Sequence, residues 1–500
     1  LIMEKSAGSA NPFRKLAKET VIYGLSTILA RLINFLFLPL YTYTLTTSSL
    51  GVAAYFLAYI AVFQVILTMG LETGCFRFAS KDNNPDEVFS NALITVGSIS
   101  LLFFGILSLF SGSISSALGY PGHSKIIVYV GVILASDCFT SILFAKLRYE
   151  HRALKFAVIK TIKIISETLF NIVLFFGAPL LLANNPGSLL GRFISPQPDF
   201  TYIIFAIFMS CIVLIILFIP EIAKIKIRFN RSLWRKMMLY SLPLMITQLP
   251  GIINDFADRL LFEHLTPAGR DWKSDLGIFF AVAKLATFMM LFIQMFRYAA
   301  EPFFFSREKE QQNSKREEYA KVTEHFTAFC MLIFLGIMLF IDVIEIVVGP
   351  DFRAGIGVVP VMLMAYLLLG LNFNISMWYK LSGKTNYGIV ITLSGLTVTL
   401  AVNLLFMPRY SYHAAAWGHL ASYLAMLLLS LWLGNRFYPI PYRWTRILSF
   451  IGAGLALFFL SKAIPPVGVI MKYAIHSLLI LIYIAIYFKI EKIPLWKSKS

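Results

Sequence analysis

Residues 201–220 read TYIIFAIFMSCIVLIILFIP. This segment holds no charged side chain, and its length is about the 20 residues that a helix needs to cross the hydrocarbon core of a bilayer. A transmembrane β-strand is about half as long and alternates between apolar and polar residues. The segment therefore predicts a membrane-spanning helix, and the rest of the chain decides how many such helices there are.

Thirteen further apolar runs of similar length occur along the 500 residues. Apolar residues make up 58% of the chain and charged residues 14%, against about 45–50% and about 25% in soluble domains. This composition excludes a soluble globule and predicts an all-α polytopic membrane protein with about 14 transmembrane helices. The predicted spans are 19–43, 51–74, 88–111, 125–147, 156–182, 201–220, 237–262, 276–300, 325–348, 356–379, 386–408, 413–434, 445–463 and 468–488.

The net charge of +18 would indicate nucleic acid as a partner in a soluble chain, but its distribution points elsewhere. With a cytoplasmic N-terminus, 31 of the 44 Lys and Arg residues fall at cytoplasmic ends, eight fall outside and five lie within spans. This asymmetry follows the positive-inside rule, so both termini are predicted in the cytoplasm and no nucleic-acid partner is expected. The first 18 residues are polar and basic, and the following apolar run exceeds a signal-peptide core, so a cleavable signal peptide is not expected.

Segments about six spans apart resemble each other. Leu50-Gly51 after the first span recurs as Leu276-Gly277 after the seventh, and six is an even number of spans, so the halves share one orientation. Helices 13 and 14 fall outside the repeat and are expected to pack laterally or to form a groove for a lipid tail. The predicted organisation is a cytoplasmic N-terminus (1–18), an N-lobe of helices 1–6 (19–230), a C-lobe of helices 7–12 (231–438) in pseudo-twofold parallel repeat, helices 13–14 (439–490) and a cytoplasmic tail (491–500).

Basic side chains within spans are candidates for substrate binding, because an ion in lipid costs a few kcal/mol. Arg31 lies halfway along the first predicted span, Arg259 in the seventh and Lys284 in the eighth. For Arg31 and Lys284, no acid of the same helix lies three or four residues away, which favours a water-filled cationic cavity. Arg77, at the end of the second span, is expected near the cavity mouth.

Acidic residues within spans are the second group of candidates. Asp255 and Arg259 lie four residues apart on one helical face, as do Lys163 and Glu167. Such pairs either lock the helix bundle or take part in transport. The four acidic candidates are Asp137, Glu167, Asp255 and Asp258.

The seventh span is interrupted by Pro243, Pro250 and Gly251, which predict a hinge beside its charges. The four cysteines stand singly in or beside apolar runs and are expected to be unpaired and buried. Neither CxxC nor HExxH occurs, so no metal site is expected. Since no loop is long enough to be a soluble catalytic domain, no catalytic residue is predicted and the function is expected within the membrane.

Four segments resemble, in order, parts of the polysaccharide exporters in the multidrug/oligosaccharidyl-lipid/polysaccharide (MOP) flippase superfamily. These segments are residues 35–41 (FLFLPLY), 70–78 (GLETGCFRF), 276–279 (LGIF) and 408–418 (PRYSYHAAAWG). Ser411 departs from the pattern, because glycine is usual at this position of the family.

The resemblance implies a flippase that moves an undecaprenyl-diphosphate-linked oligosaccharide, such as an O-antigen unit of lipopolysaccharide, across the bacterial inner membrane by alternating access. It implies a cationic cavity, whose candidates here are Arg31, Arg77, Arg259 and Lys284. It also implies an ion-driven transporter without a cofactor, in which Na⁺ or H⁺ would use Asp137, Glu167, Asp255 or Asp258. Expected partners are the lipid-linked oligosaccharide, membrane lipids and other polysaccharide-assembly proteins. Alternatives are a lipid II flippase or a multidrug exporter of the same superfamily and, less favoured, a membrane-embedded polysaccharide polymerase or ligase.

Overall fold

The computed structural model describes residues 24, 28–29, 32–80, 84–184, 191, 193–306, 312–465 and 468–491. Regular secondary structure within these ranges is helical and includes no strand, which confirms the predicted all-α fold class. Twelve helical segments of the described chain are long and apolar enough to cross a membrane. The chain is therefore a multi-pass membrane protein, as predicted.

The twelve segments overlap twelve of the predicted spans. The span predicted at 325–348 is displaced, since the helix found there is Arg316–Leu339 and the chain turns into α14 (Ile341–Ile344) and η4 (Glu345–Val347) after it. The span predicted at 19–43 is described continuously only from residue 32, where the short apolar helix Leu32–Thr44 begins. The span predicted at 237–262 lies within α10 (Arg231–Leu265). This helix of 35 residues is longer than the roughly 20 residues that cross the hydrocarbon core of a bilayer, and several of its side chains are polar. The total of 14 spans stays a prediction.

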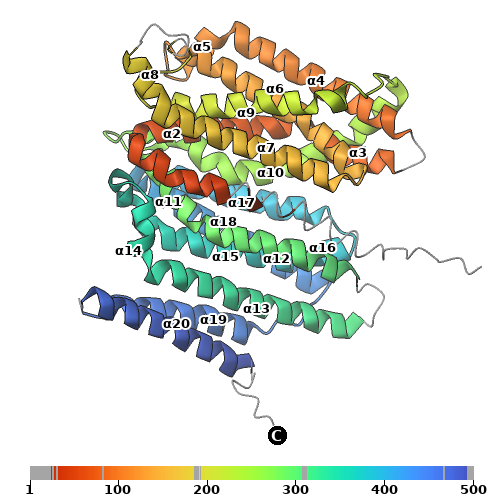
Figure 1. Cartoon of the computed structure of the whole chain (residues 1–500). Helices are drawn as coiled ribbons and strands as arrows, with labels where there is room; N and C mark the ends of the chain where they lie inside the picture. The colour runs from red at the N-terminus through yellow and green to blue at the C-terminus, as the bar shows by residue number, and fades with distance from the viewer. Residues whose placement is uncertain are drawn as a thin grey trace, which may run out of the picture. The chain divides into compact units, whose positions relative to one another are not determined.

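The chain divides into two compact units. Unit 1 comprises Leu1–Leu36 and Phe56–Leu249, and within it α4, α6, α7 and α9 lie side by side (Figure 1). The helix α2 (Thr47–Thr68) begins in unit 2 and continues in unit 1. The other helices of unit 1 before α10 are α3 (Leu71–Ala79), α4 (Pro85–Leu109), α5 (Ser111–Ala117), α6 (Ser124–Tyr149), α7 (Ala153–Ile172), the π-helix η1 (Val173–Gly177), α8 (Ala178–Asn184) and α9 (Phe200–Ile222).

Unit 2 comprises Phe37–Tyr55 and Pro250–Ser500. Within it α17 and α18 pack along each other, and α18 also packs against α15 (Figure 1). Its helices after α10 are α11 (Trp272–Ala283), the 3₁₀ turn η3 (Lys284–Ala286), α12 (Thr287–Ser306), α13 (Gln312–Leu339), α14 (Ile341–Ile344), the 3₁₀ segments η4 (Glu345–Val347) and η5 (Pro350–Val358), α15 (Val359–Ile375), α16 (Met377–Leu381), α17 (Tyr387–Tyr410), α18 (Tyr412–Phe437), α19 (Trp444–Ala463) and α20 (Val469–Glu491).

The second boundary between the units falls within α10, between Leu249 and Pro250. Pro250 is one of the three predicted hinge residues, yet α10 is helical across Pro243, Pro250 and Gly251. Hinge motion at this point stays a prediction, as do the lobe boundaries that the sequence placed between residues 230 and 231.

Local sequence explains where helices begin. The Asn84 side chain accepts a hydrogen bond of 3.0 Å from the backbone N–H of Asp86, and Pro85 supplies the first helical residue of α4. In the same way the Asp199 carboxylate accepts a hydrogen bond of 2.9 Å from the backbone N–H of Thr201 at the start of α9. These caps satisfy backbone donors that a helix end leaves without a partner.

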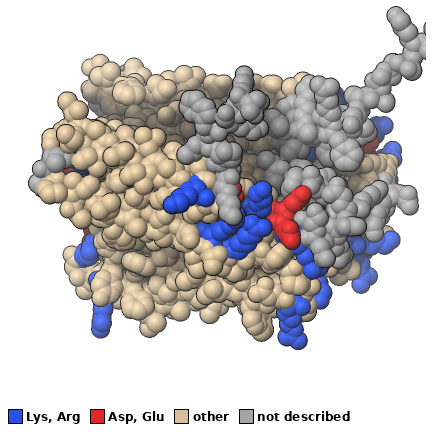
Figure 2. Space-filling model, turned by 90° about the horizontal axis from the view of Figure 1, so that it is seen from below, with Lys and Arg blue, Asp and Glu red and all other residues tan. Residues whose placement is uncertain are grey.

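The C-terminal helices α19 and α20 pack on α13 within unit 2. The Tyr483 hydroxyl donates a hydrogen bond of 3.2 Å to the Ala328 carbonyl, and Gly454 leaves room for the side chain of Met331. Seen from the side of α19 and α20, the coloured surface is mostly uncharged and its basic side chains gather in groups (Figure 2). Lateral packing is thus observed, and an uncharged outer face suits contact with lipid.

A cavity of about 550 Å³ lies among residues of α13, α14, η5, α15, α19 and α20. Its wall is mostly apolar, and Lys462, Lys472 and Asp342 add charge to it. Lys472 forms an ion pair with Asp342. The cavity therefore borders both C-terminal helices, and the groove for a lipid tail stays a prediction.

Candidate functional site

Two of the predicted cavity cations, Arg259 and Lys284, meet at one aromatic ring. The Arg259 guanidinium carbon lies 5.5 Å from the centroid of the Phe280 ring, and Lys284 Nζ lies 4.6 Å from it. The Lys284 ammonium also lies 5.8 Å from the ring centroid of Tyr41, and the Arg259 guanidinium 4.7 Å from that of Phe256. We call Tyr41, Phe256, Arg259, Phe280 and Lys284 the Phe280 cluster; all belong to unit 2.

The backbone is irregular where Lys284 enters the Phe280 cluster. A 3₁₀ turn, Lys284–Ala286, separates α11 from α12 in the middle of a continuous helical segment. Leu285 and Ala286 are buried whereas Lys284 is half-buried, so the turn keeps its apolar residues inside while part of the lysine stays accessible. A short 3₁₀ stretch inside a helix often marks a functional hinge.

Asp255 and Arg259 do not form the ion pair that their spacing permits. The Tyr423 hydroxyl on α18 donates a hydrogen bond of 3.1 Å to Asp255 Oδ1, whereas Arg259 lies over Phe256 and Phe280. Among the described residues, no carboxylate pairs with Arg259, and its buried Nε has no hydrogen-bond acceptor. Contacts with other helices therefore override the local spacing and leave this cation available for an anion.

Asp258, the next acidic candidate, pairs with a residue that sequence reasoning did not select. Its Oδ2 lies 3.2 Å from Nε2 of His419 on α18, and both side chains are buried. On the preceding turn, Asn254 Oδ1 accepts hydrogen bonds from the hydroxyls of Thr399 (2.6 Å) and Ser422 (2.9 Å). Polar residues of α10 thus face polar residues of α17 and α18 inside unit 2.

His419 and Tyr423 are the functional candidates that the sequence analysis missed. Two matching spacings could have indicated them: Asp255 and Asp258 are three residues apart, and His419 and Tyr423 are four apart, so each pair lies on one helical face. The contacts run in opposite chain directions, as between antiparallel helices. A polar face on one span needs a polar face on another, because unsatisfied polar groups are costly in a membrane.

In unit 1, the candidate acids lie on α6 and α7. Lys163 Nζ pairs with Asp137 Oδ1 of the neighbouring helix at 3.2 Å, and Glu167, the acid on its own helical face, also attracts it. The Cys211 thiol lies 3.6 Å from the same Asp137 oxygen, and all four cysteines are free and buried. Glu167 is half-buried and lies six residues before the first residue of the π-helix η1, a helix type that occurs frequently at functional sites.

The remaining candidates are spread over the chain. Arg77 on α3 is exposed, and its guanidinium carbon lies 4.0 Å from the ring centroid of Tyr240 within unit 1. Pro243 is exposed, Pro250 is buried and Gly251 is half-buried. Arg31 lies outside the described residues. The structure therefore brings Arg259 and Lys284 together within unit 2, and Arg77 belongs to unit 1.

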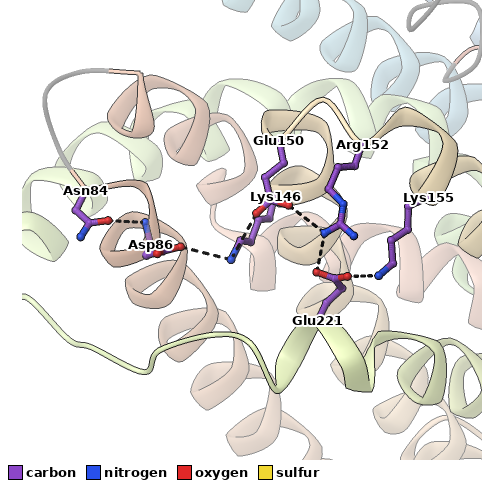
Figure 3. A network of polar contacts seen from close by, with 7 residues as sticks. All are labelled: Asn84, Asp86, Lys146, Glu150, Arg152, Lys155 and Glu221. Carbon is purple, nitrogen blue, oxygen red and sulfur yellow. Dashed lines mark hydrogen bonds and ion pairs between the residues drawn. The ribbon is translucent and has the colours of Figure 1, made fainter.

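Basic residues that were assigned to topology also form a network in unit 1 (Figure 3). Glu221 at the end of α9 pairs with Arg152 at 3.0 Å and with Lys155, so α9 is tied to the start of α7. Lys146 on α6 pairs with Asp86 on α4 at 3.6 Å. The hydrogen bond to Glu221 raises the pKa of Arg152 above its usual value. The network fastens four helices at one end of the unit.

Comparison with known proteins shows the family. The family described as "Polysaccharide biosynthesis protein" matches residues 16–306, which is more than half of the chain. No curated protein matches the chain by sequence.

Solved structures show the fold. A structure titled "Lipid II flippase MurJ, inward closed conformation" matches with a TM-score of 0.68 at 14% identity, over 94% of this chain and 99% of that one. An inward-facing multidrug resistance MATE family transporter of the MOP superfamily matches with a TM-score of 0.61 at 14% identity, over 87% and 96%. The MATE multidrug transporter DinF-BH matches with a TM-score of 0.58 at 17% identity, over 87% and 97%.

These comparisons confirm the resemblance that the sequence motifs indicated. The fold is that of MOP-superfamily transporters, and the chain belongs to the polysaccharide biosynthesis protein family.

Proposed function

We propose that the protein is a flippase that moves an undecaprenyl-diphosphate-linked oligosaccharide from the cytoplasmic to the periplasmic leaflet of a bacterial inner membrane. The observation that carries the proposal is the Phe280 cluster, in which Arg259 and Lys284 approach one ring from two helices. Membership of the polysaccharide biosynthesis family supports this class of substrate. The surface polysaccharide it serves would be an O-antigen or a related repeat unit.

The chemistry of the Phe280 cluster suits a diphosphate. Transfer of an unpaired phosphate charge into an apolar medium is prohibitive, so the path needs groups that replace water. Arginine offers a planar fork of donors for phosphate oxygens, and lysine offers a compact charge. The rings of Tyr41, Phe256 and Phe280 provide flat apolar surface on which sugar rings can stack. Arg31 and Arg77 stay candidates for substrate binding, and Asp137, Glu167, Asp255 and Asp258 stay candidates for ion coupling.

The proposal is tested with the full chain in liposomes that contain a fluorescent undecaprenyl-diphosphate-linked oligosaccharide, whose exposure in the outer leaflet is followed by chemical quenching. Arg259→Ala and Lys284→Ala should each slow translocation by about tenfold or more, because a hydrogen bond to a charged group contributes about 1.5–3 kcal/mol. Arg409→Ala is the matched control, since Arg409 is exposed at the end of α17. Unchanged translocation by both cluster variants would exclude the Phe280 cluster as the substrate site.

The alternative substrate is lipid II. It is supported by the match to the lipid II flippase, which covers 94% of this chain and so extends further than the 87% of the MATE transporters. Both lipids carry the polyprenyl diphosphate, so the Phe280 cluster suits either. A competition assay with unlabelled lipid II separates them: weak competition supports the oligosaccharide, and strong competition supports lipid II. Export of cationic drugs by the same liposomes would instead favour a multidrug exporter.

A further inference from the structure

We propose that the cavity between the C-terminal helices and α13 binds the phosphate headgroup of an anionic membrane phospholipid. We call this space of about 550 Å³ the C-terminal cavity; it is lined by residues of α13, α14, η5, α15, α19 and α20, all in unit 2. It shares no lining residue with the Phe280 cluster. The proposal therefore concerns a second lipid site and does not depend on which lipid the protein translocates.

Of the two lysines in the C-terminal cavity, Lys462 has no acidic partner. Lys472 forms an ion pair with Asp342, and Glu345 also attracts it. Among the described residues no carboxylate pairs with Lys462, whose Nζ lies 4.8 Å from the ring centroid of Phe458. An unpaired ammonium at a mostly apolar cavity favours a ligand with a negative charge, because a hydrogen bond between two ionised groups is among the strong ones.

His476 is the second polar group of the cavity that lacks a partner. Its side chain is only 8% exposed, and the buried Nδ1 has no hydrogen-bond partner in the part of the chain that the structure describes. The ring stands edge-on to that of Phe340, with centroids 6.0 Å apart and planes 88° apart. A neutral imidazole carries one N–H donor, and an unsatisfied polar group is costly away from water. A phosphate oxygen in the cavity, which His476 lines, would accept this hydrogen bond.

The positive-inside rule does not account for the two lysines. The predicted orientation places Lys462 and Lys472 on the outer side, where only eight of the 44 Lys and Arg residues fall. Two of these eight line one cavity, from α19 and from α20. Basic pockets between transmembrane helices bind anionic lipid headgroups. Binding of a phosphate from the outer leaflet gives these charges a role that topology does not.

The size and the wall of the C-terminal cavity suit a phospholipid. Its volume falls in the range of about 300–1,000 Å³ that encloses a drug-sized ligand, which is the scale of a glycerophosphate headgroup with the first carbons of its acyl chains. A polyprenyl diphosphate that carries an oligosaccharide is much larger. Apolar side chains such as Ile356, Phe458 and Ile475 would contact the acyl carbons, while Lys462 would neutralise the phosphodiester.

A lipid in this cavity would contact both C-terminal helices and the helices on which they pack. A ligand that binds only the folded state stabilises that state by mass action. Binding should therefore raise the melting temperature of the protein, which gives a readout that is independent of transport.

The binding experiment titrates the delipidated full chain in detergent with phosphatidylglycerol or with phosphatidylcholine of the same acyl chains. Native mass spectrometry measures the bound lipid, and thermal unfolding measures the stabilisation. Phosphatidylglycerol should bind about tenfold more tightly, because the choline group cancels the phosphate charge in the other lipid. Lys462→Met should remove the preference. Lys489→Met is the matched control, since Lys489 is exposed near the end of α20 and does not line the cavity.

Equal affinity for the two lipids, or a preference that survives in Lys462→Met, overturns the proposal. A second variant fills the space without changing a charge. Gly357 lines the cavity, and a Cβ atom there would meet no other atom within 4 Å, so Gly357→Leu should fold and weaken binding of phosphatidylglycerol about tenfold. Gly336→Leu is its control, because Gly336 of α13 has equal space and does not line the cavity. Unchanged binding by Gly357→Leu would place the lipid elsewhere.

Two further ligands identify the source of the phosphate. Inorganic phosphate at millimolar concentration should not displace phosphatidylglycerol, since the apolar wall contributes to lipid binding; displacement would show a site for free anions and overturn the lipid assignment. Undecaprenyl phosphate should compete weakly, and competition as strong as that of phosphatidylglycerol would assign the cavity to the polyprenyl lipid instead. All these measurements record binding, so failure of translocation would reject the proposed function and leave this site standing.

Discussion

At the scale of single residues, charged side chains form ion pairs with residues of neighbouring helices. Lys163 pairs with Asp137 of α6 at 3.2 Å, in addition to the attraction of Glu167 one turn away on its own helix. The side chains of Lys163 and Asp137 are 22% and 17% exposed, so neither charge is fully hydrated. A lysine reaches several ångströms from its backbone, and the neighbouring helix offers an acid at the depth where water is scarce.

We predict that Lys163→Met destabilises the protein by about 2 kcal/mol, because Asp137 is left without its counter-charge. The double variant Asp137→Asn/Lys163→Met should recover most of this loss, since no uncompensated charge remains. Thermal unfolding in detergent measures both effects, and Lys236→Met, at an exposed position of α10, is the control. A double variant as unstable as the single variant would contradict a role of the pair in stability.

At the scale of helices, α2 and α11 meet through the matched glycines of the predicted repeat. A Cβ atom on Gly51 would lie 1.8 Å from the Lys273 carbonyl oxygen, and one on Gly277 would lie 1.9 Å from that of Thr47. Thr47 and Gly51 stand in the same relation in α2 as Lys273 and Gly277 in α11. The contact is therefore reciprocal: each glycine faces the backbone carbonyl that lies four residues before the other glycine. The pseudo-twofold parallel repeat stays a prediction.

We predict that Gly51→Ala and Gly277→Ala each lower the melting temperature of the detergent-solubilised protein. Each methyl group would overlap a backbone carbonyl, and overpacking costs about 1–3 kcal/mol or more. Because the contact is reciprocal, the two losses should be similar. Gly105→Ala on α4 is the control, since no atom lies within 4 Å of its Cβ position and alanine favours a helix. A decrease in melting temperature as small as that of Gly105→Ala would show that the crossing of α2 and α11 tolerates a side chain.

At the scale of the whole molecule, the topology is predicted from the distribution of Lys and Arg residues and from the lengths of the apolar segments. The same basic residues that the sequence assigns to the cytoplasmic side also form the ion pairs of Figure 3, so they serve stability as well as orientation. The four native cysteines are free and buried, which leaves the surface open to labelling at a single introduced cysteine.

We predict that a membrane-impermeant maleimide labels Arg409→Cys in intact cells and labels Arg231→Cys only after the membrane is opened. Both positions are exposed, at the end of α17 and at the start of α10. The predicted orientation places them on opposite sides of the membrane. Labelling of both in intact cells, or the reverse pattern, would contradict that orientation.

Twelve of the predicted spans were found as apolar helices of membrane-spanning length, because in a bilayer the backbone must satisfy its own hydrogen bonds over a fixed thickness. Charged residues within the predicted spans could be selected as candidates from the sequence, because an ion in lipid is costly. Their partners could not be predicted. The contacts of Asp258 with His419 and of Arg259 with Phe280 depend on how each helix is rotated about its axis and packed against the next.

The sequence by itself determined the membrane-spanning architecture and the family, because segment length, polarity and short motifs are properties of the chain alone. The tertiary structure decided which side chains meet. It assigned His419 to Asp258, brought Arg259 and Lys284 to the ring of Phe280 and placed the ring of Tyr41 near Lys284. Helix rotation and depth result from the packing of many apolar side chains at once, so no local pattern in the sequence states them.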